Sequence, residues 1–236
     1  MGQMHYLPLS LPFFALLVGA FLIVLALIQI GILRYAYLRI GVSSRAAMFL
    51  LLGSLIGSYV NIPIVELPER NVESGIEVSF FGMQYVVPAV VEWPGTVIAV
   101  NVGGAVIPGL LSLYLLFKNR MWLNGLIATA VITAIVHVLA YPVPGVGIAV
   151  PVFVPPVATA LVALLLAREN AAALAYVSGS LGTLIGADLL NLDAVRGLGA
   201  PVASIGGAGT FDGIFLTGIL SVLLASLYSR PRAQPV

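Results

Sequence analysis

Two apolar runs decide how this chain folds, and they read Leu181-Gly-Thr-Leu-Ile-Gly-Ala-Asp188-Leu-Leu-Asn191 and Ser204-Ile-Gly-Gly-Ala-Gly-Thr-Phe-Asp212-Gly-Ile-Phe-Leu216. Each run reads as part of a membrane helix, and a Gly-rich connector joins them. Each also carries one aspartate in an otherwise apolar setting. Placing a charged side chain at the bilayer centre costs about 2.5–3.5 kcal/mol, so such residues are usually functional. The two aspartates are therefore the first candidates for a site.

The composition predicts an integral membrane protein. Of 236 residues, 61% are hydrophobic and 8% are charged, whereas soluble domains have about 25% charged residues. We expect an all-α polytopic membrane protein whose residues 1–236 form a single domain. A net charge of +1 does not indicate nucleic-acid binding. With no cysteine and two histidines, the chain lacks the usual ligands for a thiolate or His-rich metal site, so we expect neither metal nor cofactor.

About seven transmembrane helices are predicted from the apolar runs, each near the length that crosses about 30 Å of hydrocarbon. The fifth run is short and flanked by prolines. The predicted spans cover 12–33, 46–65, 96–117, 121–141, 152–167, 171–192 and 210–228.

The basic residues predict the orientation of these spans. If the N-terminus lies outside a cell membrane, eight of the ten Lys and Arg residues fall on the cytoplasmic side, together with the C-terminus. This agrees with the positive-inside rule. The cytoplasmic set comprises Arg34, Arg39, Arg45, Lys118, Arg120, Arg168, Arg230 and Arg232.

One polar insertion, residues 66–95, interrupts the apolar pattern. It is rich in β-branched and aromatic residues between 76 and 91, and Gly82-Met83 is suited to a tight turn, so we expect an external β-hairpin. Two roles are open for it: a cap over the outer face, or a strand edge that pairs with an extended peptide.

Two further segments, 142–156 and 197–209, are too rich in Pro and Gly for a regular helix. Irregular backbone at membrane depth occurs only where it is buried in protein or lines a wet cavity. These segments are therefore expected to be external loops or re-entrant. They do not align with one another, and we expect no internal repeat in the chain.

The predicted topology brings polar residues from several spans to one depth near the outer side. These residues are Asn61, Glu66, Asn101, His137, Asp188 and Asp212. Two carboxylates a few ångströms apart would share a proton, as in aspartic proteases, where one activates water and the other acts as an acid. In this interpretation Asp188 and Asp212 are catalytic. The expected substrate-binding residues are Gly206, Gly207, Gly209, Gly213, Asn101 and His137, the glycines because they allow close approach of a substrate backbone.

Structural roles for the same residues stay open. Asp212 could be the N-cap of the last helix, and Asp188 could bond to a hydroxyl of a neighbouring helix. His137, Asn61 and Asn101 could serve helix packing alone.

The run Gly186-Ala-Asp188-Leu-Leu, taken with 204–215, resembles a family of prokaryotic multi-pass membrane proteins known as a domain of unknown function. More distantly, the two runs are similar to the GxGD intramembrane aspartyl proteases, the presenilin and signal peptide peptidase group. That likeness implies an aspartate on the sixth helix, here Asp188, and another opening the seventh, here Asp212. In this chain Thr210 and Phe211 separate Gly209 from Asp212, and no later Pro-Ala-Leu helix follows.

Three functions follow from these patterns. The first is an intramembrane aspartyl hydrolase that acts on a membrane-embedded peptide. The second is a proton- or cation-coupled transporter or channel, with Asp188, Asp212 and His137 along its path. The third is a structural protein in which the aspartates belong to a closed hydrogen-bond network. In each case the partner is the lipid bilayer, and the oligomeric state is undetermined.

Overall fold

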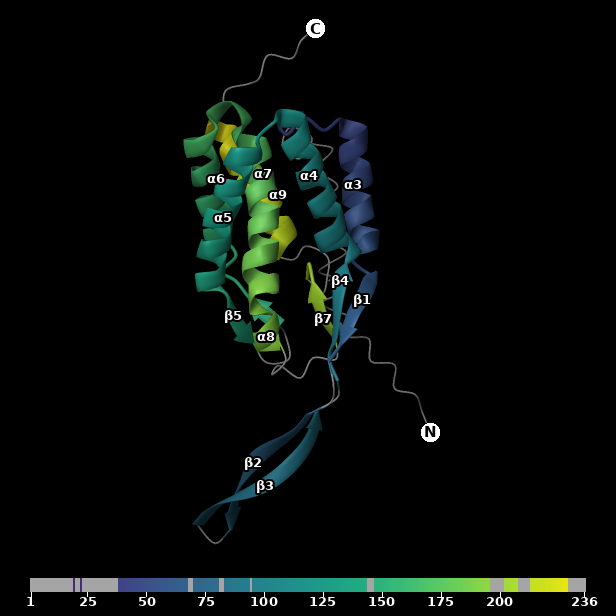
Figure 1. Ribbon diagram of the computed structural model, residues 1–236, viewed down its shortest axis with the longest axis vertical. Coiled ribbons are helices and arrows are strands. Elements are labelled where there is room, and N and C mark those ends of the chain that lie inside the picture. Colours follow the sequence, from purple (N-terminus) through teal and green to yellow (C-terminus); the bar gives the residue numbers. More distant parts are fainter. Residues whose placement is uncertain are drawn as a thin grey trace.

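The computed structural model describes residues 19, 22, 38–67, 70–80, 83–93, 95–143, 147–195, 202–207 and 213–228. Within these ranges helices form one layered bundle, the helical body, and short strands gather at one end of it (Figure 1). The helices of this body are α3 (Ser44–Gly57), α4 (Ile107–Asn119), α5 (Trp122–Leu139), α6 (Val154–Leu166), α7 (Ala171–Thr183) and α9 (Gly213–Tyr228).

Helix α7 forms the centre of the helical body. It contacts α4, α5, α6 and α9, and nearly all of its residues are buried. Its sequence is dominated by Ala, Gly and Ser, and small residues let membrane helices approach closely. A Cβ added at Gly182 would lie 2.7 Å from Ile132 Cγ2 of α5, and one at Gly218 of α9 would lie 2.6 Å from Ser180 Oγ. Glycine at these positions therefore brings α5 and α9 directly onto α7.

Three helical stretches are long and apolar enough to cross a membrane: Val102–Asn119, Trp122–Leu139 and Arg168–Ala194. Helices α3, α6 and the end of α9 are shorter apolar helices. The predicted helices at 121–141, 152–167, 171–192 and 210–228 correspond to α5, α6, the α7 stretch and α9. The predicted first span, 12–33, lies outside the described residues apart from Gly19 and Leu22.

Two predicted spans are only partly helical, and here the sequence-based prediction is wrong. The predicted span at 46–65 is helical only as far as Gly57, where α3 ends. Its last residues belong to strand β1 (Asn61–Glu66). The span at 96–117 begins as strand β4 (Val97–Asn101), which passes into a π-helical turn, η1 (Val102–Val106), before α4. Hydropathy does not distinguish an apolar strand from an apolar helix, and β1 pairs along one edge with β4.

Strands β1 and β4 belong to a three-stranded sheet in which β7 (Val202–Ile205) is the third member. The order is β1-β4-β7, with β1 antiparallel and β7 parallel to β4. In the parallel pair Val97 lies opposite Val202 and Val100 lies opposite Ile205. The prediction of an all-α fold is therefore corrected: the helical body carries a small mixed sheet at one end.

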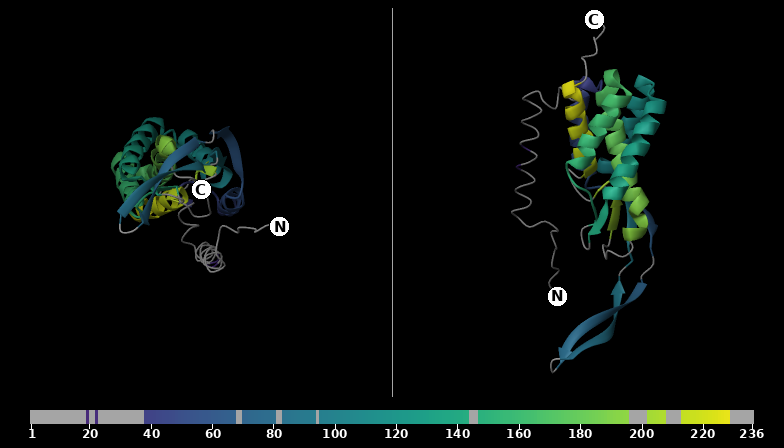
Figure 2. Two further views of the ribbon diagram at one scale, coloured as in Figure 1. Left: turned by 90° about the horizontal axis from the view of Figure 1, so that it is seen from below. Right: turned by 90° about the vertical axis from the view of Figure 1, so that its left-hand side faces the viewer.

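The insertion between β1 and β4 forms the predicted hairpin. Strands β2 (Arg70–Phe80) and β3 (Met83–Trp93) pair antiparallel along their whole length, with Phe80 opposite Met83. The hairpin extends away from the helical body (Figure 2), and its two strands contact chiefly one another.

Other irregular segments surround α6 and follow α7. Between α5 and α6 the chain forms a short antiparallel ribbon of β5 (Tyr141–Val143) and β6 (Gly147–Ala149), so the Pro-rich segment is not a regular helix, as predicted. Between α6 and α7 lies a 3-10 turn, η2 (Arg168–Asn170). After α7 the helix loosens through η3 (Leu184–Asp188), η4 (Leu189–Asn191) and α8 (Leu192–Val195).

Candidate functional site

Polar side chains and glycines meet where β4 and β7 end, at the level at which the helices begin. We call this region the strand–helix junction and define it by Asn61, Asn101, Gly104, Asp188, Ser204 and Gly206. Its members come from β1, β4, η1, η3 and β7. Asn61, Asn101 and Asp188 were predicted to lie at one depth, and Gly206 was a predicted substrate-binding residue. Gly104 and Ser204 were not singled out, because β7 and its pairing with β4 were not foreseen.

Asp188 is the ionisable member of the junction. It is the last residue of η3, a π-helical turn at the end of α7, and its side chain is half-buried. Its Oδ2 accepts a hydrogen bond of 2.7 Å from the backbone amide of Gly206. A bond from an amide to a carboxylate is charge-assisted and stronger than one between neutral groups. The carboxylate is thus held against the Gly-rich connector that follows β7.

Asn101 is the most buried polar side chain of the junction, with no exposed surface. Its Nδ2 donates to the carbonyl of Ser58 at 2.8 Å and to Asn61 Oδ1 at 3.1 Å. Its Oδ1 accepts from the amide of Gly104 at 2.9 Å and so caps the π-helical turn η1. Asn101 therefore satisfies backbone groups that the change from strand to helix would leave unpaired.

Ser204 joins the second strand to the same network. Its hydroxyl lies 2.7 Å from Asn61 Oδ1 and 2.8 Å from the carbonyl of Gly207. Asn61, on the exposed side of β1, thereby receives bonds from β4 and from β7. Ser204 was not predicted as a site residue, although its position just before Gly206-Gly207 was a usable signal.

Glycines let the backbones of η1 and the β7 connector touch. A Cβ added at Gly104 would lie 1.8 Å from the carbonyl oxygen of Gly206. Gly206 and Gly207 have φ values of +97° and +82°, a region that other residues rarely adopt. A side chain at Gly104 or Gly206 would push η1 and the β7 connector apart. Of the predicted substrate-binding glycines, Gly206 and Gly207 therefore have a demonstrable packing or conformational role.

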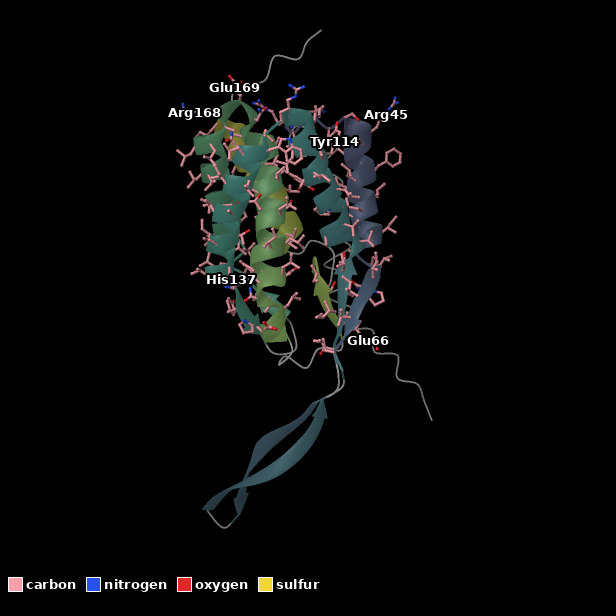
Figure 3. All side chains as sticks on the ribbon, viewed as in Figure 1. Arg45, Glu66, Tyr114, His137, Arg168 and Glu169 are labelled. Carbon is pink, nitrogen blue, oxygen red and sulfur yellow. The ribbon has the colours of Figure 1, made fainter. Side chains whose placement is uncertain are left out.

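His137 lies apart from the junction but close to the turn that bears Asp188. It is exposed in the last turn of α5, and its Nδ1 is 3.3 Å from Asn191 Nδ2. Asn191 also donates to the carbonyls of Gly186 and Ala187. Asn191, which the sequence did not single out, thus connects His137 to η3. Figure 3 shows His137 and Glu66 toward the end of the molecule opposite Arg45, Arg168 and Glu169.

The remaining predicted residues are only partly placed. Gly213 is the first residue of α9 and is exposed, with open space around its Cα. Asp212 and Gly209 lie outside the described residues, and with them the distance between the two aspartates. Glu66 ends β1 and is exposed. Among the described residues no group of three or more His, Asp or Glu side chains could hold a metal ion.

Comparison with known proteins supplies a family but no activity. Residues 55–224 match a family model described as a protein of unknown function, DUF1614. No curated protein matches the chain, and no solved structure matches it. The matched range contains every residue of the junction.

Proposed function

The chain belongs to the DUF1614 family, and from its geometry we propose that it is an integral membrane carrier for protons or small cations, with Asp188 as the ion-binding group. The observation that carries this proposal is the position of the Asp188 carboxylate. It lies near the end of a stretch apolar enough to cross a membrane, Arg168–Ala194, and accepts a hydrogen bond from the backbone amide of Gly206 in a glycine-broken segment. In many carriers the coupling-ion site is built from such broken helices and an embedded carboxylate.

The surrounding chemistry supports a site for a small ion. The junction presents amide, hydroxyl and carboxylate oxygens from four segments, including Asn61 Oδ1, Ser204 Oγ and Asp188. Oxygen ligands suit hard cations, and a carboxylate is the common proton-binding group of membrane pumps and transporters.

The same proposal includes the membrane topology. We place seven spans in a cell membrane, with the N-terminus outside and the C-terminus in the cytoplasm, so that the junction and the hairpin lie near the outer surface. The distribution of basic residues supports this orientation, and Arg45 and Arg168 share one end of the described structure (Figure 3).

Ion flux into proteoliposomes tests the carrier. Purified protein is reconstituted with an entrapped pH-sensitive dye, and flux is driven by a K⁺ gradient with valinomycin; a parallel assay measures radioactive Na⁺ uptake. We expect flux in at least one assay and its loss in Asp188→Asn, because the amide cannot carry the charge that binds the ion. The matched control is Asp193→Asn, in the exposed helix α8. Equal flux in Asp188→Asn and wild type would overturn the assignment, as would no flux in either assay.

An intramembrane aspartyl hydrolase is the second candidate, and a specific observation favours it. Helices α7 and α9 pack side by side, and the connector between them returns to Asp188 through Gly206. Asp212 directly precedes α9. A dyad of Asp188 and Asp212 would use the chemistry of the GxGD proteases, with the connector or the hairpin holding an extended peptide.

Peptide cleavage distinguishes this candidate from the carrier. The reconstituted protein is incubated with membrane-helix peptides, and products are detected by mass spectrometry. The hydrolase predicts cleavage that is lost both in Asp188→Asn and in Asp212→Asn. Cleavage that survives either substitution would exclude the dyad.

A further inference from the structure

Two short motifs occur twice in this chain, in the same order. Gly53-Ser-Leu-Ile-Gly57 is repeated as Gly182-Thr-Leu-Ile-Gly186, and Asn101-Val-Gly-Gly-Ala105 is repeated as Ser204-Ile-Gly-Gly-Ala208. These motifs contradict the expectation that the chain holds no internal repeat. The segments 142–156 and 197–209 do not align because the counterpart of Ser204–Ala208 lies at 101–105. The spacing between the motifs is longer in the first copy by close to the length of the β2–β3 hairpin, which the second copy lacks.

The repeated motifs occupy equivalent places in the structure. In each copy the first motif lies where a helix ends, at the end of α3 or across the end of α7 and the start of η3. The second motif begins in the last residues of a strand, β4 or β7, and the next helix follows. The two strands run parallel, and α4 and α9 both lie on the helical side of them (Figure 1).

Packing between the motifs is also equivalent. In the first copy the end of α3 meets the second motif, since a Cβ on Gly57 would lie 2.9 Å from the amide nitrogen of Gly103. In the second copy the residue that meets the corresponding glycine, Gly206, is Asp188, two positions after Gly186. The matching position in the first copy is Tyr59, which is 75% exposed. The acidic side chain therefore belongs to one copy alone.

The two copies touch at the strand–helix junction. Gly104 of the first copy lies against the carbonyl of Gly206 of the second, without side chains between them. One side-chain oxygen bridges the copies. Asn61 Oδ1 accepts from Asn101 Nδ2 at 3.1 Å and from Ser204 Oγ at 2.7 Å. Asn101 and Ser204 are the equivalent first residues of the second motif.

We propose that the chain is an internal duplication whose two copies, α3 to α4 and α7 to α9, move against each other at this junction, with Asn61 as the positioning residue that couples them. Parallel repeats around one site are a known architecture of carriers, which work by rocking one repeat against the other. At Gly104 and Gly206 the copies meet through backbone atoms alone. They are also joined by the β4–β7 pairing and by the packing of α4 on α7, so the proposed movement pivots about these contacts. The Asn61 oxygen supplies the polar link that favours the observed arrangement. The assignment of this motion to transport rests on the proposed carrier function.

Distances between spin labels test the proposal in the full-length protein. The chain has no native cysteine, so labels can be attached only where cysteines are introduced. One pair, Phe117→Cys with Leu227→Cys, spans the two copies; these residues are 63% and 74% exposed on α4 and α9. A second pair, Phe49→Cys with Phe117→Cys, stays within the first copy. Double electron–electron resonance is measured in lipid nanodiscs.

In Asn61→Leu we expect the distance distribution between copies to shift or broaden, while the pair within the first copy is unchanged. Asn61→Asp keeps an acceptor oxygen, so we expect it to show the same distribution of distances between copies as the wild type. The matched control Asn124→Leu removes a half-buried asparagine of α5 that bonds to the carbonyl of Leu166 of α6, and it should have no effect. An unchanged distribution between copies in Asn61→Leu would overturn the proposal. A change of equal size within the first copy would also overturn it, because Asn61 would then simply hold the fold together.

These distances are independent of ion flux, so the two proposals fail separately. If the protein shows ion flux but the distance between copies is unchanged in Asn61→Leu, the coupling role of Asn61 is overturned and the carrier proposal stands. If the distance between copies changes in Asn61→Leu but the protein shows no ion flux, the carrier proposal is overturned and the coupled duplication stands.

Discussion

At the scale of single residues, the junction depends on glycines that lack a Cβ atom and on one buried asparagine side chain. Gly104 and Gly206 lack the Cβ atoms that would separate η1 from the β7 connector. Asn101 satisfies the amide of Gly104 and the carbonyl of Ser58 with one buried side chain. The glycines let the two backbones meet, and Asn101 keeps the polar groups beside them paired, which matters because buried unpaired polar groups are costly.

Gly104→Ala should therefore destabilise the protein strongly. The new methyl would lie 1.8 Å from the Gly206 carbonyl oxygen, so one backbone would have to move. We expect a lower unfolding temperature in detergent, measured by intrinsic fluorescence. The control is Gly109→Ala in α4, where nothing lies within 4 Å. An equal unfolding temperature for the two variants would contradict the close backbone contact.

Asn101→Ala should also destabilise the protein, for a different reason. It leaves the Gly104 amide and the Ser58 carbonyl without their side-chain partner, at roughly 1–3 kcal/mol for each buried group left unpaired. Asn124→Ala, which removes one exposed bond of 3.3 Å, should change the unfolding temperature much less. Thermal unfolding of the two variants side by side measures the difference, and similar losses would argue against a special role for Asn101.

At the scale of elements, helices in the second half of the chain were predictable and the strands at the junction were not. Helices α5, α6 and α9 follow long apolar runs whose ends are marked by Arg, Pro or Gly. β1 and β4 occupy equally apolar runs, and Pro63 was the only local sign that a helix could not continue through β1. Their strand state depends on pairing with each other and with β7, which lies about a hundred residues further along the chain.

The β2–β3 hairpin should be dispensable for folding of the helical body. Its strands contact chiefly one another, and the second copy of the repeat has no counterpart to it. Replacing 68–94 with a short Gly-Ser linker keeps the pairing of Glu66 with Val97 possible. We expect a monodisperse protein by size-exclusion chromatography with an unfolding temperature close to that of the wild type. Aggregation of this variant would show that the hairpin stabilises the helical body.

At the scale of the whole molecule, the charged residues of the described part are sorted to opposite ends. Arg45, Arg168 and Glu169 lie at one end, and Glu66 lies beyond the other end of the helices (Figure 3). The exposed surface between these ends is rich in large apolar side chains, such as Phe49, Leu126 and Leu165. This is the pattern expected of a body surrounded by lipid.

Labelling from one side of the membrane tests the proposed orientation. Single cysteines at Glu66 and Glu169, both exposed, are treated in intact cells with a membrane-impermeant maleimide. With the N-terminus outside, Glu66→Cys should react in intact cells and Glu169→Cys only after lysis. The reverse result would invert the topology, and reaction of both in intact cells would contradict a membrane between the two ends.

Composition alone determined that the chain is apolar enough for a membrane. The local pattern determined most of its helices and the hairpin, and it predicted Asp188 as a site residue. These properties depend on short-range chemistry: side-chain hydropathy, proline and glycine, and isolated charges in apolar runs. The tertiary structure alone decided that β4 and β7 lie parallel, that Gly206 binds Asp188, and that Asn61 joins two similar strand ends. Such contacts depend on pairing between distant segments, which hydropathy and periodicity within one segment do not specify.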